Sequence, residues 1–136
     1  MNKNTLNILT YNIYYKSMLG LDKNFLPKEE AHKNIKKTIK DNSKGNFIIA
    51  LQEVQALDKI LPNNISKTNL IISKSGEETL VTIWSKNYKL IKTRISKFSD
   101  GRPIQLTLLA DKDYILLIVN IHAAHQNQNF GRYLGK

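Results

Sequence analysis

Three apolar stretches of this sequence each end in a polar side chain of a type that takes part in catalysis. Asn12 lies in "TYNI", Glu53 follows "FIIAL" in "ALQEV", and His122 follows "YILLIVNI" in "NIHAAH". Carboxylate and amide oxygens are ligands that suit Mg²⁺ or Mn²⁺. An imidazole can donate a hydrogen bond to a phosphoryl oxygen as negative charge develops on it. If the fold brings these side chains together, they predict a site for a divalent cation and a phosphate.

Each of these residues also has an ordinary structural interpretation when it is taken alone. A glutamate after a buried strand is more often solvated or a capping residue, and an asparagine at a strand end is more often a turn former. A histidine at a strand end is more often a satisfied residue at the rim of the core. The functional interpretation therefore depends on whether the three strand ends meet.

The first part of the chain predicts a strand–helix–strand unit. Residues 7–13 alternate between two faces, as in a strand, whereas residues 47–51 are apolar on both faces, as in a central strand. Between them a helix is expected from Pro27 to about Lys40, with an apolar stripe of Ala31, Ile35 and Ile39. Such a crossover makes the two strands parallel, so their carboxyl ends lie at one edge, where open α/β sheets bind ligands.

The rest of the chain predicts a run of strands joined by short turns. The expected strands are residues 69–73, 80–85, 90–95, 103–109 and 114–121. Short links such as "SGEE", "SKN" and "DKD" are typical of hairpins. We therefore predict an α/β fold with a mixed sheet, as in α+β proteins. A strand–helix–strand unit and a β-meander form this sheet, and at least one helix lies on it.

Composition narrows the functional classes only in part. The 136 residues contain 41% hydrophobic residues, which can support a core, and no cysteine, which excludes disulfides and thiolate metal sites. The net charge of +10 favours polyanionic partners, but lysine outnumbers arginine 18 to 3, as A/T-rich codons alone would produce. No apolar run reaches the roughly 18 residues of a membrane span, and no signal peptide is visible, so we expect a cytoplasmic protein.

Four segments resemble successive motifs of one enzyme superfamily. "LNILTYNI", "NFIIALQEV", "GRPIQLTLL" and "LLIVNIHAAH" are similar, in order and spacing, to motifs of the endonuclease/exonuclease/phosphatase superfamily, the pancreatic-deoxyribonuclease-like phosphoesterases. The resemblance covers Leu6 to about His125, and "QEV" is its most specific piece. It implies a metal-dependent phosphoester hydrolase, a nuclease or a phosphodiesterase, with Mg²⁺ or Mn²⁺ as the cofactor.

The resemblance also implies roles for individual residues. Glu53 would be the principal metal ligand, Asn12 would help to position the metal and the phosphate, and His122 would hydrogen-bond the scissile phosphate. Arg102, in "DGRP", would lie near the phosphate, and Gln52 would support Glu53 from behind. His125 has no firm counterpart. Tyr14 and Tyr15 are candidates for stacking on a base, although rim packing is the commoner role of such tyrosines.

The sequence departs from the superfamily in its second half. The superfamily fold is a longer, four-layered α/β sandwich that carries a "GDFN"-type motif, whose Asp activates the attacking water, and a terminal "SDH"-type motif. Neither motif occurs here. We therefore expect residues 1–136 to form a single, incomplete domain, the N-terminal half of such a sandwich, inactive alone. One apolar face of its sheet would then be uncovered, which favours poor solubility or self-association.

Two alternatives to the hydrolase remain open. The chain could be a non-catalytic basic module that binds nucleic acid or a phosphoinositide, or it could be an inactive fragment. The expected partners are a phosphodiester substrate, with DNA, RNA, phosphoinositides and sphingomyelin as candidates, and a second chain or second copy that completes the sandwich.

Overall fold

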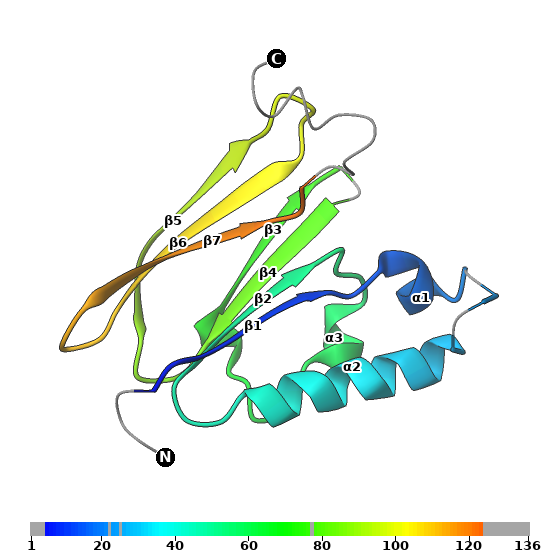
Figure 1. Cartoon of the computed structure of the whole chain (residues 1–136), viewed down its shortest axis with the longest axis horizontal. Helices are drawn as coiled ribbons and strands as arrows, with labels where there is room; N and C mark the ends of the chain where they lie inside the picture. Colours follow the sequence, from blue (N-terminus) through cyan, green and yellow to red (C-terminus); the bar gives the residue numbers. More distant parts are fainter. Residues whose placement is uncertain (1–4, 22, 25, 77, 124–136) are drawn as a thin grey trace.

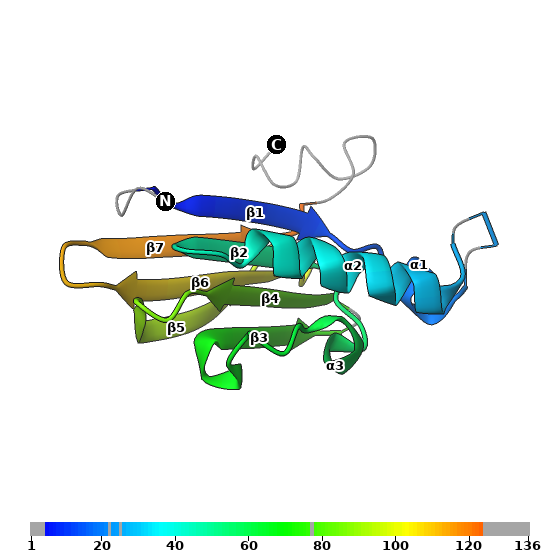
Figure 2. The same ribbon diagram turned by 90° about the horizontal axis from the view of Figure 1, so that it is seen from below.

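Two β-sheets lie face to face, and helices cover the outer side of one of them (Figures 1 and 2). This architecture comes from a computed structural model that describes residues 5–21, 23–24, 26–76 and 78–123. In chain order the elements are β1 (Asn7–Asn12), α1 (Tyr15–Leu19), α2 (Lys28–Asn42), β2 (Phe47–Gln52), α3 (Leu57–Ile60), a 3-10 helix η1 (Lys67–Asn69), β3 (Leu70–Ser75), β4 (Glu78–Trp84), β5 (Lys89–Lys97), β6 (Pro103–Ala110) and β7 (Ile115–Ile121).

The first sheet has the strand order β1-β2-β4-β3. β1 and β2 are parallel, in register from Asn7 opposite Phe47 to Asn12 opposite Gln52, and β4 is antiparallel to both of its neighbours. The predicted parallel pair is therefore confirmed. Because the two strands run together to their carboxyl ends, Asn12 and Glu53 come out at the same edge of the sheet.

Helix α2 connects the parallel strands and covers one face of the first sheet (Figure 1). Its three predicted apolar positions, Ala31, Ile35 and Ile39, are buried, while its other faces are rich in lysine. Ile35 and Ile39 pack into a core with Ile49, Leu51 and Ile83 of the sheet. No helix among the described residues is long and apolar enough to cross a membrane.

The second sheet is formed by β5, β6 and β7, all antiparallel, and it is separate from the first (Figure 1). The expectation that the strand–helix–strand unit and the following strands form one mixed sheet was wrong. A turn after β4, closed by a hydrogen bond from Tyr88 N–H to Ser85 O, carries the chain across to the second sheet. Ile48 and Trp84 of the first sheet then pack against Leu109 of the second.

The second sheet covers the face of the first sheet that we expected to be uncovered. Alternate residues of β6 point into this contact: Gln105, Thr107 and Leu109 are fully buried. The opposite, outer face of the second sheet exposes Ile115, Leu117 and Val119 of β7. The uncovered apolar surface therefore exists, but on the second sheet instead of the first.

Candidate metal and phosphate site

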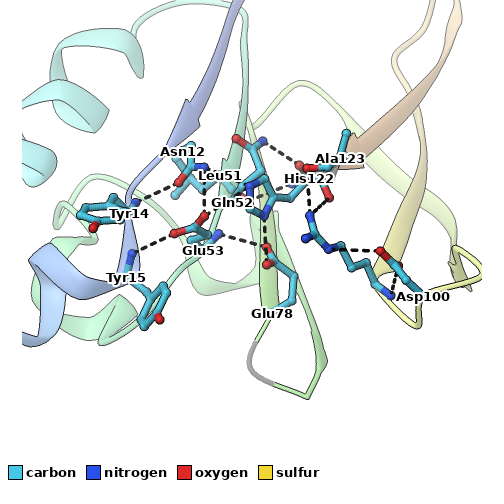
Figure 3. Close-up of polar contacts among 12 residues, drawn as sticks. Asn12, Tyr14, Tyr15, Leu51, Gln52, Glu53, Glu78, Asp100, His122 and Ala123 are labelled. Atoms are coloured by element: carbon cyan, nitrogen blue, oxygen red, sulfur yellow. Dashed lines mark hydrogen bonds and ion pairs between the residues drawn. The ribbon is translucent and has the colours of Figure 1, made fainter. Parts of the chain in front are cut away.

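Asn12, Glu53 and His122 meet at the carboxyl ends of β1, β2 and β7 (Figure 3). The amide nitrogen Nδ2 of Asn12 donates to Glu53 Oε1 at 3.2 Å, and His122 Nε2 lies 3.3 Å from the same carboxylate oxygen. Asn12 and Glu53 follow the parallel strands of the first sheet, whereas His122 follows β7 of the second. Packing of the two sheets therefore assembles the group that the sequence predicted.

The backbone around this group adopts conformations that are unusual for residues other than glycine. Glu53 has φ 55° and Tyr14 has φ 63°, both in the left-handed region. These turns bring backbone N–H groups to the side chains: Tyr15 N–H donates to Glu53 Oε2 at 3.2 Å, and Tyr14 N–H donates to Asn12 Oδ1 at 2.9 Å. Left-handed non-glycine residues cost free energy and cluster at functional sites, so these turns support a functional assignment.

Glu78 is a fourth member of the group, and it was missed from the sequence. Its Oε2 lies 3.0 Å from Nδ1 of His122, and its Oε1 accepts a hydrogen bond from Glu53 N–H at 3.3 Å. Glu78 begins β4, which is antiparallel to β2, so the start of β4 lies at the edge where β2 ends. That topological relation could have identified it, but "SGEE" was interpreted only as a hairpin turn.

The imidazole of His122 is therefore held between two carboxylates. Nδ1 faces Glu78, while Nε2 faces Glu53 and Asn12. Only 18%, 14% and 16% of the side chains of His122, Glu53 and Glu78 are exposed, so water screens these contacts weakly. If Nδ1–H donates to Glu78, neutral His122 accepts at Nε2 from Asn12, and protonated His122 can donate from Nε2 to an anion.

Arg102 and Gln52 lie near the group but do not point into its centre. Nη1 of Arg102 donates to the carbonyl oxygens of His122 at 3.4 Å and Ala123 at 2.8 Å, and its Nε lies 3.5 Å from Asp100 Oδ2. Arg102 thus holds the end of β7, and its contact with a phosphate stays a prediction. Gln52 is buried between the sheets, where its Nε2 donates to Asn120 Oδ1 at 2.8 Å.

An open cleft of about 480 Å³ lies in front of the group. Tyr15, Glu53, Glu78, Asp100, Arg102 and His122 are among the residues that line it. The rings of Tyr14 and Tyr15 are tilted by 58° with centroids 6.4 Å apart, so they do not form a flat stacking platform together. His125 lies outside the described residues. Both carboxylates and the imidazole therefore face the same cleft.

The donors suit a largely hydrated cation better than one enclosed by protein. Among the described residues there is no cluster of three or more His, Asp or Glu side chains arranged to hold a metal ion. Mg²⁺ keeps several waters and commonly binds through one or two carboxylates, which Glu53 and Glu78 can provide at the cleft. Asn12 directs its nitrogen to Glu53 and its oxygen to Tyr14 N–H, so its role as a direct ligand stays a prediction.

Known proteins resemble this chain in structure but not detectably in sequence. No protein-family model and no curated protein matches it. Solved structures of TDP2 (tyrosyl-DNA phosphodiesterase 2) do match, among them the following three. TDP2 from Caenorhabditis elegans has a TM-score of 0.68 and 19% identity over 90% of this chain. A truncated form of that protein has a TM-score of 0.68 and 20% identity over 90% of this chain. A humanized TDP2 from D. rerio has a TM-score of 0.63 and 16% identity over 92% of this chain.

These similarities show the fold. The mixed α/β arrangement with two sheets is that of a deoxyribonuclease-I-like phosphodiesterase, over the part that aligns. The chain spans 36% of the C. elegans protein chain, 47% of its truncated form and 50% of the D. rerio chain. The expected half of a deoxyribonuclease-like sandwich is therefore confirmed at the level of the fold.

Proposed function

We propose that this chain carries the metal-binding and phosphate-binding part of a metal-dependent phosphoester hydrolase. The observation that carries the proposal is the meeting of Glu53, Glu78 and His122 at one cleft, from strands far apart in the sequence, with Asn12 hydrogen-bonded to Glu53. A structural role alone does not require an imidazole between two poorly exposed carboxylates. The similarity of the fold to TDP2 phosphodiesterases supports the same class of reaction.

Each residue has a distinct task in this proposal. Glu53 binds Mg²⁺ or Mn²⁺, and Asn12 and Tyr15 N–H orient its carboxylate. When bound, the cation polarises a phosphoryl oxygen and stabilises the charge that develops on the leaving oxygen. His122 donates from Nε2 to another phosphoryl oxygen, while Glu78 holds Nδ1 and fixes the plane of the ring. Arg102 adds positive charge at the rim of the cleft, near the phosphate.

A nucleic-acid phosphodiester is the substrate class we propose. The similar structures are phosphodiesterases whose name refers to DNA. The net charge of +10 favours a polyanion, and the cleft is open enough for a chain to pass across it. Codon bias could still supply part of the charge, so the site geometry carries more weight than the charge.

The described residues favour binding over turnover by this chain alone. Three carboxylates line the cleft, and each already has a partner: Glu53 contacts Asn12 and His122, Glu78 contacts His122, and Asp100 contacts Arg102. None of these three carboxylates is left without a partner, as a general base that takes a proton from an attacking water would be. We propose that a further polypeptide, either a second chain or a second copy, covers the outer face of the second sheet and supplies the remaining groups.

Binding of a DNA oligonucleotide to the full chain, measured by calorimetry with and without Mg²⁺, tests the proposal. Binding should be tighter with Mg²⁺, and Glu53→Gln should remove the Mg²⁺ dependence because it removes the ligand charge but keeps the shape. Glu30→Gln is the matched control, since Glu30 is an exposed carboxylate on α2, far from the cleft in sequence. Cleavage of the same DNA should stay at background. The same Mg²⁺ dependence in wild type and Glu53→Gln would contradict the proposal.

A further inference from the structure

Three buried amide side chains lie between the two sheets, directly behind the candidate site. Gln52, Gln105 and Asn120 are 6%, 0% and 1% exposed, and each comes from a different strand or strand end. Nε2 of Gln52 donates to Asn120 Oδ1 at 2.8 Å. Primary amides are rarely buried this completely in a contact between sheets, because each one left unpaired is costly. Their position calls for a reason beyond packing.

Asn120 lies where the pairing of β2 and β4 is interrupted. The regular ladder between these strands ends at Leu51 opposite Val81. Nδ2 of Asn120 donates to the carbonyl oxygens of both residues, at 3.2 Å and 3.1 Å. The amide of a residue in the second sheet therefore bridges two strands of the first sheet, at the last position where they are paired in register.

The register of the two strands changes immediately beyond this bridge. Continuing the ladder would place Glu53 opposite Thr79, but Val54 N–H bonds Thr79 O instead, at 3.1 Å. Glu53 is thus an extra residue in its strand, and its φ of 55° fits such a bulge. A bulge bends the strand and redirects the side chain, which here sends the Glu53 carboxylate toward His122.

Asn120 is also linked to the site through its own strand. Residues two apart in a strand point to the same face, so Asn120 and His122 both face the first sheet. β7 packs over β2 and β4 in this region (Figure 2). A fixed position for Asn120 therefore fixes where His122 emerges, relative to the two carboxylates that contact it.

We propose that Asn120 is a positioning residue, whose amide locks β7 onto the interrupted end of the β2–β4 ladder and so sets the spacing of Glu53, Glu78 and His122. The value of that spacing for the reaction rests on the proposed function, whereas the positioning itself does not. The side-chain amide of Asn120 donates to the two backbone carbonyl oxygens and accepts from Gln52. A leucine would leave Gln52 and two backbone carbonyls without this partner, and an aspartate would keep only the acceptor.

The test compares Asn120→Leu with Gln105→Leu in the full chain. Gln105 is the matched control because its amide is equally buried, but its Nε2 donates to Ile71 O, Ser73 Oγ and Leu80 O of the first sheet, and its contact with Asn120 is long, 3.5 Å from Asn120 Nδ2 to Gln105 Oε1. Both variants should lose similar thermal stability. The readouts are the ¹⁵N and N–H signals of the His122 ring, by NMR without metal, and the affinity for Mn²⁺.

In Asn120→Leu the slowly exchanging Nδ1–H signal of His122 should disappear, and Mn²⁺ affinity should fall at least about tenfold, as when an outer-shell partner of a metal ligand is lost. In Gln105→Leu the Nδ1–H signal of His122 and the Mn²⁺ affinity should both stay close to their wild-type values. Equal changes in the two variants, or an unchanged His122 ring in Asn120→Leu, would overturn the proposal.

If Asn120→Leu does not fold, Asn120→Asp provides the same test at pH 8. This variant preserves the size of the side chain and the acceptor for Gln52, but it removes the donor to the carbonyl oxygens of Leu51 and Val81. The Nδ1–H signal of His122 should therefore disappear as well, and unchanged ring signals would again overturn the proposal. Failure of the wild-type chain to bind Mn²⁺ would contradict the proposed function but not the positioning, because the ring signals are measured without metal.

Discussion

His122 is held by contacts on both of its ring nitrogens and on its backbone carbonyl oxygen. Its two ring nitrogens contact two different carboxylates, and its carbonyl oxygen accepts from Arg102. Glu78 and Arg102 both hold the ring in place and leave Nε2 facing Glu53 at the cleft. Such an arrangement fixes the orientation of an imidazole, as the proposed role at a phosphate requires.

Replacing His122 with alanine should lower the rate of an active assembly far more than replacing His125. Loss of a preorganised donor to a developing charge typically costs on the order of 100- to 1,000-fold in rate. Steady-state hydrolysis of a DNA phosphodiester, with a normal melting curve for each variant, measures this. Equal losses in His122→Ala and His125→Ala would show that the wrong histidine has been assigned to the phosphate.

Sequence reasoning succeeded for residues whose position follows from strand direction. Asn12 and Glu53 end parallel strands, so their meeting was predictable, and the "NIH" match placed His122 with them. Glu78 was missed because a glutamate beside a glycine turn has no local signal of function. Its role depends on the antiparallel pairing of β4 with β2, which is a long-range contact.

At the scale of the elements, the division of the strands into two sheets was the main feature that the sequence did not predict. β4 and β5 are joined by a short turn, which resembles a hairpin in sequence but connects two layers. Helix α2 and the seven strands of the described residues were predicted with small differences at their ends, with α2 running from Lys28 to Asn42, whereas the short helices α1 and α3 were not predicted. Local periodicity specifies elements, whereas assignment of strands to sheets depends on which apolar faces pack together.

The turn between the sheets contains a tyrosine whose ionisation should weaken the fold. Burial of Tyr88 raises its pKa above the usual 10.0, with further contributions from Tyr114 and Asp111. Above about pH 10 the unfolded chain therefore loses this proton before the folded chain does, and the free energy of unfolding falls as pH rises. Urea unfolding at pH 8 and pH 10.5 should show a smaller decrease for Tyr88→Phe than for wild type. Equal decreases would mean that Tyr88 does not contribute.

At the scale of the whole molecule, the outer face of the second sheet is the largest departure from a closed globular surface. Ile115, Leu117 and Val119 are 65%, 61% and 52% exposed, next to Leu106 and Leu108 of β6. β5 adds Lys89, Lys92 and Arg94 along the same side of the sheet. A contiguous apolar surface of this kind usually marks a contact with another chain or a liability for association.

The chain alone should therefore self-associate, and polar substitutions on this face should reduce the association. Ile115→Thr combined with Leu117→Thr preserves strand propensity but removes apolar surface. Sedimentation velocity over a range of concentrations should show larger species for wild type than for the double variant. Ile8→Thr is the control, because Ile8 is 68% exposed but lies on β1 of the other sheet. A wild-type chain that stays monomeric, or an equal effect of Ile8→Thr, would contradict this expectation.

The central claim is that Glu53 binds a divalent cation at the cleft, beside Glu78 and His122, and paramagnetic broadening by Mn²⁺ tests it most directly. Titration of the ¹⁵N-labelled chain with Mn²⁺ should first broaden the amide signals of the residues around this group, including Asn12, Glu53 and Glu78. The broadening should be lost in Glu53→Gln and retained in Glu30→Gln. Broadening that is centred elsewhere, or that persists unchanged in Glu53→Gln, would contradict the account.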